Sequence, residues 1–307
     1  MSARIAFVTM VRDEPVFLPL WVRHYAAIAP RAQLFILFDG LDQQVPDAAD
    51  GCQVLRLPQG VVGPGWDDAR WRMLSGFANT LLERFDVVVL NDVDELIVLD
   101  PEAGDDLAAA FAEAADIGVI SPFAIELVHR TDLEPEPLNL TRPLLAQRRH
   151  GRINASYCKP CIVARKVIWS LGGHYSDFPT LHLSRKLFLF HLRAMDAGLL
   201  RDRQVLRRAH VADAGGRIVD QVAGQGWSRT ADEMDAFLTS FQDRPPEVSD
   251  FRFDWQRQRI EASWAQDPAT GLWRHDRLHN RRSYILPDRF SALIQTPGGL
   301  TDPAGKD

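Results

Sequence analysis

The sequence contains little cysteine and no long hydrophobic run, and these two absences exclude several classes of protein. Only three of the 307 residues are cysteine, which is too few for a disulfide framework. Cys158 and Cys161 have the spacing of zinc ligands, but two further ligands are missing nearby. No run of 18 or more apolar residues occurs, so we expect no transmembrane helix. Residues 1–8 lack the apolar core and cleavage site of a signal peptide, which predicts a cytoplasmic location.

An excess of positive charge is also absent, because the formal net charge is −6. This charge gives no general reason to expect a nucleic-acid partner, although contact with the surface of a membrane stays compatible with it. The apolar share of 46% and the charged share of 25% are those of an ordinary globular protein. Internal repeats and low-complexity blocks are missing too. The length fits one large domain with a modest appendage.

The first 120 residues alternate between predicted strands and predicted helices. Short runs of Val, Ile, Leu and Phe predict strands, and apolar residues at helical spacing predict the helices between them. The expected strands are Ile5–Thr9, Leu34–Phe38, Val54–Leu57, Val87–Leu90 and Ile117–Ser121. We expect a first helix after Asp13, with Asp13 as its cap, and two further helices over Ala69–Phe85 and Leu107–Ala115. This pattern predicts an α/β fold with a buried, mostly parallel central sheet flanked by helices.

The alternation stops after residue 121, and we expect a long loop region from Pro122 to Pro160 because of its many prolines. An apolar strand, Leu187–Phe190, is expected to end at His191, and a helix to cover Arg193–Arg208. We therefore predict a main domain over residues 1–210, divided at about residue 121. Residues 211–307 are expected to be a partly helical C-terminal extension with a loose tail.

Three carboxylates directly follow the apolar strand Val87–Leu90, in the segment Asp92-Val93-Asp94-Glu95. In an extended chain, residues i and i+2 point to the same side, so Asp92 and Asp94 are expected to aim together. Two such oxygen ligands, with room for a substrate phosphate, fit Mg²⁺ or Mn²⁺. Ligands of open α/β sheets bind at the carboxyl ends of the strands, which is where this motif, the segment Val11–Glu14 and Asp39 are predicted to lie.

Four motifs follow one another along the first part of the chain, in the segments Thr9–Glu14, Trp21–Tyr25, Leu37–Gly40 and Asn91–Leu96. Together they resemble the family-2-type glycosyltransferases of the GT-A fold, in the subgroup that carries a D-x-D-E motif. The likeness is good over about the first 125 residues, and it implies a donor half at 1–121 and an acceptor half at 122–210.

The resemblance implies a GT-A-like fold and a metal-dependent transfer of a sugar from a nucleotide-diphosphate donor, most simply a UDP-sugar, to the hydroxyl of a glycan or other acceptor. It favours inversion at the sugar, and it is compatible with cell-surface or extracellular polysaccharide synthesis. Arg12 and Glu14 match the first nucleotide-binding loop, and Asp39 matches the acid that contacts base or ribose. Arg70 matches an arginine near the diphosphate. Asp92 matches a residue that binds both donor and metal.

The same resemblance implies Mn²⁺ or Mg²⁺ as cofactor, with Asp92 and Asp94 as ligands. A histidine after a later strand is the implied third ligand, and we expect it to be His191, with His174 as the competing choice. The acceptor hydroxyl needs a general base, commonly Asp or Glu. Asp177 is our candidate for this base and Glu126 the second choice.

Two other functions stay open. A nucleotidyltransferase would use similar metal and nucleotide chemistry, but it usually has a glycine-rich loop after the first strand, and Val11–Glu14 contains no glycine. A non-catalytic nucleotide- or sugar-binding module with a degenerate site is the alternative from a different class.

Overall fold

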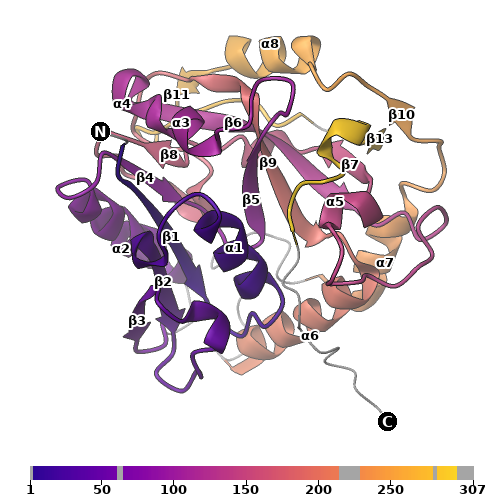
Figure 1. The fold of residues 1–307 in the computed structure, drawn as a ribbon, viewed down its shortest axis with the longest axis horizontal. Coiled ribbons are helices and arrows are strands. Elements are labelled where there is room, and N and C mark those ends of the chain that lie inside the picture. The colour runs from indigo at the N-terminus through magenta and orange to yellow at the C-terminus, as the bar shows by residue number, and fades with distance from the viewer. Residues whose placement is uncertain (1–2, 61–64, 214–228, 279–281, 296–307) are drawn as a thin grey trace.

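A large mixed sheet forms the centre of the molecule, and helices cover both of its faces (Figure 1). The computed structural model describes residues 3–60, 65–213, 229–278 and 282–295. Within these residues, eleven strands belong to the sheet. Nine of them follow the order β10-β13-β7-β6-β8-β4-β1-β2-β3, and off this path β9 pairs with β6 while β5 pairs with β9. These strands are β1 (Ile5–Val11), β2 (Leu34–Asp39), β3 (Gln53–Leu57), β4 (Val87–Leu90), β5 (Glu95–Leu99), β6 (Val119–Val128), β7 (His150–Ile153), β8 (Ile162–Val163), β9 (Leu183–Ala194), β10 (Glu247–Val248) and β13 (Tyr284–Ile285).

The helices pack on the sheet according to the alternation of side chains along its strands. The α-helices are α1 (Phe17–Ala26), α2 (Trp66–Leu81), α3 (Leu107–Ala112), α4 (Ala114–Ile117), α5 (Leu144–Gln147), α6 (Ala197–Asp213), α7 (Ala231–Thr239) and α8 (Asp254–Ala262). On β1, Ile5 and Phe7 face the cluster that includes α1 and α3, whereas Ala6 and Val8 face the cluster that includes α2. A separate two-stranded sheet joins β11 (Ala265–Gln266) to β12 (Trp273–Arg274).

The predicted fold class is confirmed, because β3, β2, β1 and β4 form a contiguous parallel block flanked by helices. Antiparallel pairs enter the sheet beyond β4, where β8 joins β4 to β6. The four strands predicted before residue 91 are present. Asp13 is not the cap of α1, because the N-cap is Val16 and Asp13 has a positive φ of 53°.

Two expectations after residue 91 are wrong. The strand predicted to end at Ser121 continues as β6 to Val128, with a register shift against β9 between Ser121 and Phe123 that accommodates the intervening proline. The predicted loop region therefore holds part of β6 and all of β7. The other error is that β9 does not end at His191 but runs three residues further, to Ala194.

The strand β5 was not predicted, and it matters because it pairs antiparallel with β9 directly after the acidic motif. The C-terminal part of the chain also reaches the central sheet. There β13 pairs with β7, and the buried rings of Phe251 and Phe290 contact Phe188 of β9. Among the described residues, none of the helices has the length and apolar character needed to cross a membrane.

Candidate functional site

Three of the predicted site residues lie at the same edge of the parallel block. Arg12 follows β1, Asp39 is the last residue of β2, and Asp92 follows β4 by two positions. Because β4, β1 and β2 are adjacent and parallel, their carboxyl ends meet at one edge. This is the edge at which open α/β sheets bind their ligands.

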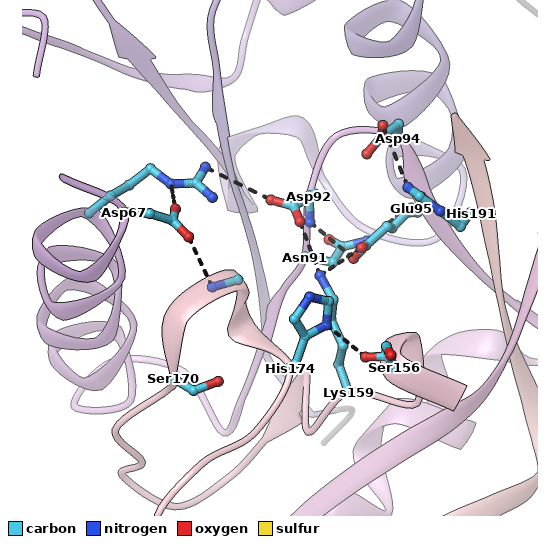
Figure 2. Close-up of polar contacts among 12 residues, drawn as sticks. Asp67, Asn91, Asp92, Asp94, Glu95, Ser156, Lys159, Ser170, His174 and His191 are labelled. Atoms are coloured by element: carbon cyan, nitrogen blue, oxygen red, sulfur yellow. Dashed lines mark hydrogen bonds and ion pairs between the residues drawn. The ribbon is translucent and has the colours of Figure 1, made fainter. Parts of the chain in front are cut away.

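The acidic motif forms a turn rather than an extended strand end. The backbone N–H of Glu95 donates to the carbonyl oxygen of Asp92 over 3.0 Å, which closes the turn between β4 and β5. The prediction that Asp92 and Asp94 aim together rested on extended geometry and does not apply to a turn. Figure 2 shows the result: Asp92 lies toward Lys159, while Asp94 lies toward His191.

Lys159 is a buried ammonium group that joins two carboxylates of the motif. Its Nζ donates to Oδ2 of Asp92 over 3.0 Å and lies 2.6 Å from Oε1 of Glu95 (Figure 2). The side chain is 1% exposed, and the Trp71 and Tyr157 rings lie beside it. Burial alone would lower the pKa of Lys159, but the two carboxylates raise it, so the ammonium stays charged.

Arg70 brings a second cation to Asp92 from the first turns of α2. Its Nε donates to Oδ1 of Asp67 over 2.9 Å, and its Nη1 lies 4.0 Å from Oδ1 of Asp92. Burial alone would raise the pKa of Asp92, but Lys159 and Arg70 hold it below its ordinary value. The Asp92 side chain is 32% exposed, so this carboxylate is both ionised and open to a ligand.

Asp94 and Glu14 share a different cation, Arg203 of α6. The Nη1 of Arg203 donates to Oδ2 of Asp94 over 2.6 Å, and its Nη2 donates to Glu14. Its guanidinium also lies over the Phe17 ring at 4.4 Å. Burial raises the pKa of Glu14, whereas Arg203 and His191 hold that of Asp94 well below its ordinary value despite burial.

His191 connects the acidic motif to the second predicted base through strand register. On β9 it is opposite Glu95 of β5 on one side and Glu126 of β6 on the other. Its Nε2 lies 3.7 Å from Oδ2 of Asp94, and its Nδ1 lies 3.3 Å from Oε1 of Glu126. Burial alone would lower the pKa of His191, but Asp94 and Glu126 raise it to about 9. Each ring nitrogen of this imidazole therefore lies near a carboxylate.

Arg12 and Asp39 form a neighbouring group at the same edge. The Nη1 of Arg12 donates to the carbonyl oxygen of Asp39 over 2.6 Å and also pairs with Asp42. Oδ1 of Asp39 accepts the backbone N–H of Gly60 over 2.9 Å. A Cβ at position 60 would press on the Trp66 indole, so glycine permits this close approach.

Each of the three predicted metal ligands, Asp92, Asp94 and His191, contacts another charged or titratable side chain in this structure. The Nε2 of His191 lies 3.7 Å from Oδ2 of Asp94, and Oδ2 of Asp92 accepts from Nζ of Lys159. Asp94 is held by Arg203 and is buried, whereas Asp92 is partly exposed. Among the described residues, no group of three or more His, Cys, Asp and Glu side chains is placed to hold a metal ion. The metal site stays a prediction without structural support.

The two candidate bases lie in different environments. Glu126 belongs to the connected group, where it accepts from Nε of Arg152 over 2.6 Å, and Arg152 and His191 lower its pKa despite burial. Asp177 is exposed and accepts the backbone N–H of Ile168 over 2.8 Å, and the structure does not bring it into contact with the acidic motif. His174, the competing histidine, lies with Nδ1 2.6 Å from the carbonyl oxygen of Ser156, and burial lowers its pKa to about 3.

Sequence reasoning missed the two central cations, Lys159 and Arg203. Lys159 lies between the two cysteines that were considered only as a weak zinc motif, and Arg203 lies in a helix rich in arginine. A single lysine in an apolar segment was the available signal for Lys159, because a lysine is almost never fully buried unless it is paired. No comparable local signal marks Arg203 among the arginines of α6.

No family model and no curated protein matches the chain. Among solved structures, glucosyl-3-phosphoglycerate synthase from Mycobacterium tuberculosis, in complex with Mn²⁺, UDP-glucose and phosphoglyceric acid, is 18% identical with a TM-score of 0.24. The match covers 47% of this chain and 50% of that one, so the chain spans about half the length of that enzyme.

Two further structures are similar to larger shares of this chain. Mannose-1-phosphate geranyltransferase from Thermus thermophilus is 16% identical, covering 76% of this chain and 67% of its own, with a TM-score of 0.23. An active-site mutant of LgtC is 11% identical, covering 92% and 86%, with a TM-score of 0.26. These similarities are too slight to carry a functional argument, which therefore rests on the site itself.

Proposed function

We propose that this protein is a glycosyltransferase that moves a sugar from a nucleotide-diphosphate donor, a UDP-sugar, to an acceptor hydroxyl. The observation that carries the proposal is the convergence of Arg12, Asp39 and Asp92 at the carboxyl edge of β1, β2 and β4, with Arg70 beside the exposed carboxylate. The four resembling sequence motifs support the same reading. The alternative is a non-catalytic module that binds a nucleotide or sugar. Turnover of a nucleotide sugar distinguishes the enzyme from such a module.

In the proposed reaction, the acceptor oxygen forms a bond to C1 of the sugar while the bond from C1 to the diphosphate oxygen breaks. The diphosphate leaves with the electron pair, and the acceptor proton passes to a base. Arg70 is placed to neutralise the leaving diphosphate, because fixed cations stabilise charge that develops in the transition state. Asp39 is the proposed acceptor of hydrogen bonds from the base or ribose, with Arg12 and Glu14 in the adjoining loop.

We propose that Asp92 and Asp94 shape this site through their ion pairs, and we assign no step to a metal. The implied Mn²⁺ or Mg²⁺ would have Asp92 as its most accessible ligand. For the base, Asp177→Asn and Glu126→Gln decide between the two predicted carboxylates. Loss of turnover with UDP binding retained identifies the base.

Calorimetric titration with UDP tests the donor site. We expect Arg70→Gln to weaken UDP binding at least about tenfold, since a hydrogen bond to a charged group contributes about 1.5–3 kcal/mol. Arg72→Gln is the matched control, because Arg72 is an exposed arginine of the same helix that pairs with Asp68. Its affinity for UDP should equal that of the unmodified chain.

Two outcomes of this titration test the proposal further. If no nucleoside diphosphate binds to the unmodified chain, the donor-site proposal is wrong. The titration is repeated in EDTA and with added Mn²⁺. Binding that appears only with Mn²⁺ supports the predicted metal with Asp92 as a ligand, and binding that persists in EDTA contradicts it. A screen of nucleotide sugars for donor hydrolysis then identifies the sugar and separates an enzyme from a binding module.

A further inference from the structure

A polar pocket lies beside α8, away from the candidate site. Arg185, Arg252, Asp254 and Arg257 line it, and its volume is about 410 Å³. In Figure 1, α8 lies at the top of the molecule, while α6, which supplies Arg203 to the candidate site, lies at the bottom. The pocket is therefore separate from the carboxyl edge of the parallel strands.

Arg257 is a buried guanidinium that forms no ion pair with a carboxylate of the residues that the structure describes. Its Nε donates to the carbonyl oxygen of Arg252 over 2.7 Å, and its Nη1 donates to that of Ser184 over 2.6 Å. Its Nη2 is buried with no hydrogen-bond partner, and the whole residue is 1% exposed. Burial lowers the pKa of Arg257 to about 10. The guanidinium lies over the Phe123 ring at 4.2 Å, a cation–π contact that offsets part of the cost of its burial. An anion in the pocket would supply the partner of opposite charge that this contact does not.

The surroundings of Arg257 add positive charge. Arg185 and Arg252 are 67% and 77% exposed at the pocket, so their side chains can reorient toward a ligand. Asp254 pairs with Arg185 at 2.8 Å, and Asp250 pairs with Arg252 at 3.5 Å. The four lining residues are three arginines and one aspartate, which leaves a formal charge of +2 on the lining.

The N-terminus of α8 also favours a bound anion. Its N-cap residue, Phe253, makes no side-chain cap bond, and the helix continues for nine residues from Asp254. Helix N-termini carry partial positive charge and bind anions, and arginine pairs with phosphate through two parallel hydrogen bonds. A tetrahedral anion with several acceptor oxygens matches this set of donors better than a planar carboxylate does.

We propose that this pocket is a second binding site, which takes a small ligand carrying a phosphate group. The pocket volume falls in the range of small-molecule sites, about 300–1,000 Å³, so it can hold an organic phosphate ester as well as the free ion. The proposal does not depend on the function of the donor site, because the two sites share no residue.

Calorimetric titration of the full chain with inorganic phosphate tests this proposal. We expect saturable binding that Arg252→Gln weakens at least about tenfold, as loss of a charged hydrogen bond predicts, and that Arg257→Met abolishes. Arg252→Gln is the decisive variant, because this exposed side chain can be changed with little risk to folding. Arg259→Gln, an exposed arginine of α8 outside the lining, is the matched control and should bind like the unmodified chain.

Arg70→Gln separates this pocket from the donor site, and it should keep phosphate binding at α8. The proposal is overturned if phosphate does not saturate, or if Arg252→Gln and Arg259→Gln bind equally. It is also overturned if Arg70→Gln loses phosphate binding while Arg252→Gln retains it. A last titration uses acetate at equal ionic strength. If acetate binds more tightly than phosphate, the proposal that the ligand carries a phosphate group is wrong.

Discussion

At the scale of single residues, the candidate site depends on cations that hold its carboxylates in place. Lys159 lies between Asp92 and Glu95, and Arg203 lies between Asp94 and Glu14. A buried carboxylate is tolerated only with a partner, so each cation fixes the direction of two acids. The carboxylates of the acidic motif are therefore each paired with a cation.

Lys159→Met should destabilise the fold by about 3–5 kcal/mol, because removal of one member of a buried ion pair leaves an uncompensated charge. Urea unfolding measures this change. Glu95→Gln in the same chain removes that buried charge, so the double variant should lose less stability than the sum of the two single variants. Additive losses would show that Lys159 and Glu95 are not energetically coupled.

At the scale of elements, α2 is held against the turn that follows β8. This turn, η4 (Leu171–Gly173), donates the N–H of Gly172 to Oδ2 of Asp67 over 3.2 Å. Gly173 has a φ of 64°, and a Cβ there would overlap the ring of Trp71. Because α2 also carries Arg70, the packing of this turn sets the position of a proposed donor-site cation.

Gly173→Ala should destabilise the protein by about 1–3 kcal/mol, through overpacking against Trp71 and an unfavourable backbone conformation. Gly76→Ala is the matched control in α2, where nothing lies within 4 Å of the added Cβ. That change should instead stabilise by about 0.5–1 kcal/mol, since alanine favours a helix over glycine. Equal unfolding midpoints for both variants would contradict the packing described for η4.

At the scale of the whole molecule, the last described segments pack into the main core. Phe290 is fully buried and lies 5.5 Å from Phe188 and 5.8 Å from Phe190, measured between ring centroids. These contacts join residues about a hundred positions apart to the strand that carries His191. A substitution at Phe290 can therefore test the proposed division of the chain at residue 210.

Phe290→Ala should destabilise the fold by about 3–5 kcal/mol if the C-terminal segment is part of one cooperative unit. A loss below about 1 kcal/mol would instead indicate an appendage that unfolds separately, as a division at residue 210 predicts. Denaturant unfolding, followed by tryptophan fluorescence and by circular dichroism, measures both quantities. Phe241→Ala serves for comparison, because it removes another buried phenylalanine ring, in the cluster of α6 and α7.

The sequence by itself determined the α/β class, the first four strands and the edge at which the acidic motif lies. These features follow from local patterns, because runs of buried apolar residues predict strands and the chain order predicts parallel pairing. Arg70 and Asp92 were also predicted to lie in one site, and the structure brings them within 4.0 Å.

Only the tertiary structure decided what each carboxylate of the motif contacts. Asp92 meets Lys159 across 67 positions, Asp94 meets Arg203 across 109, and Glu14 meets Arg203 across 189. The turn at Asp92–Glu95 and the unpredicted strand β5 then place Glu95 opposite His191. Such pairings depend on strand register and on helix packing between distant segments, and a pattern of neighbouring residues contains no information about either.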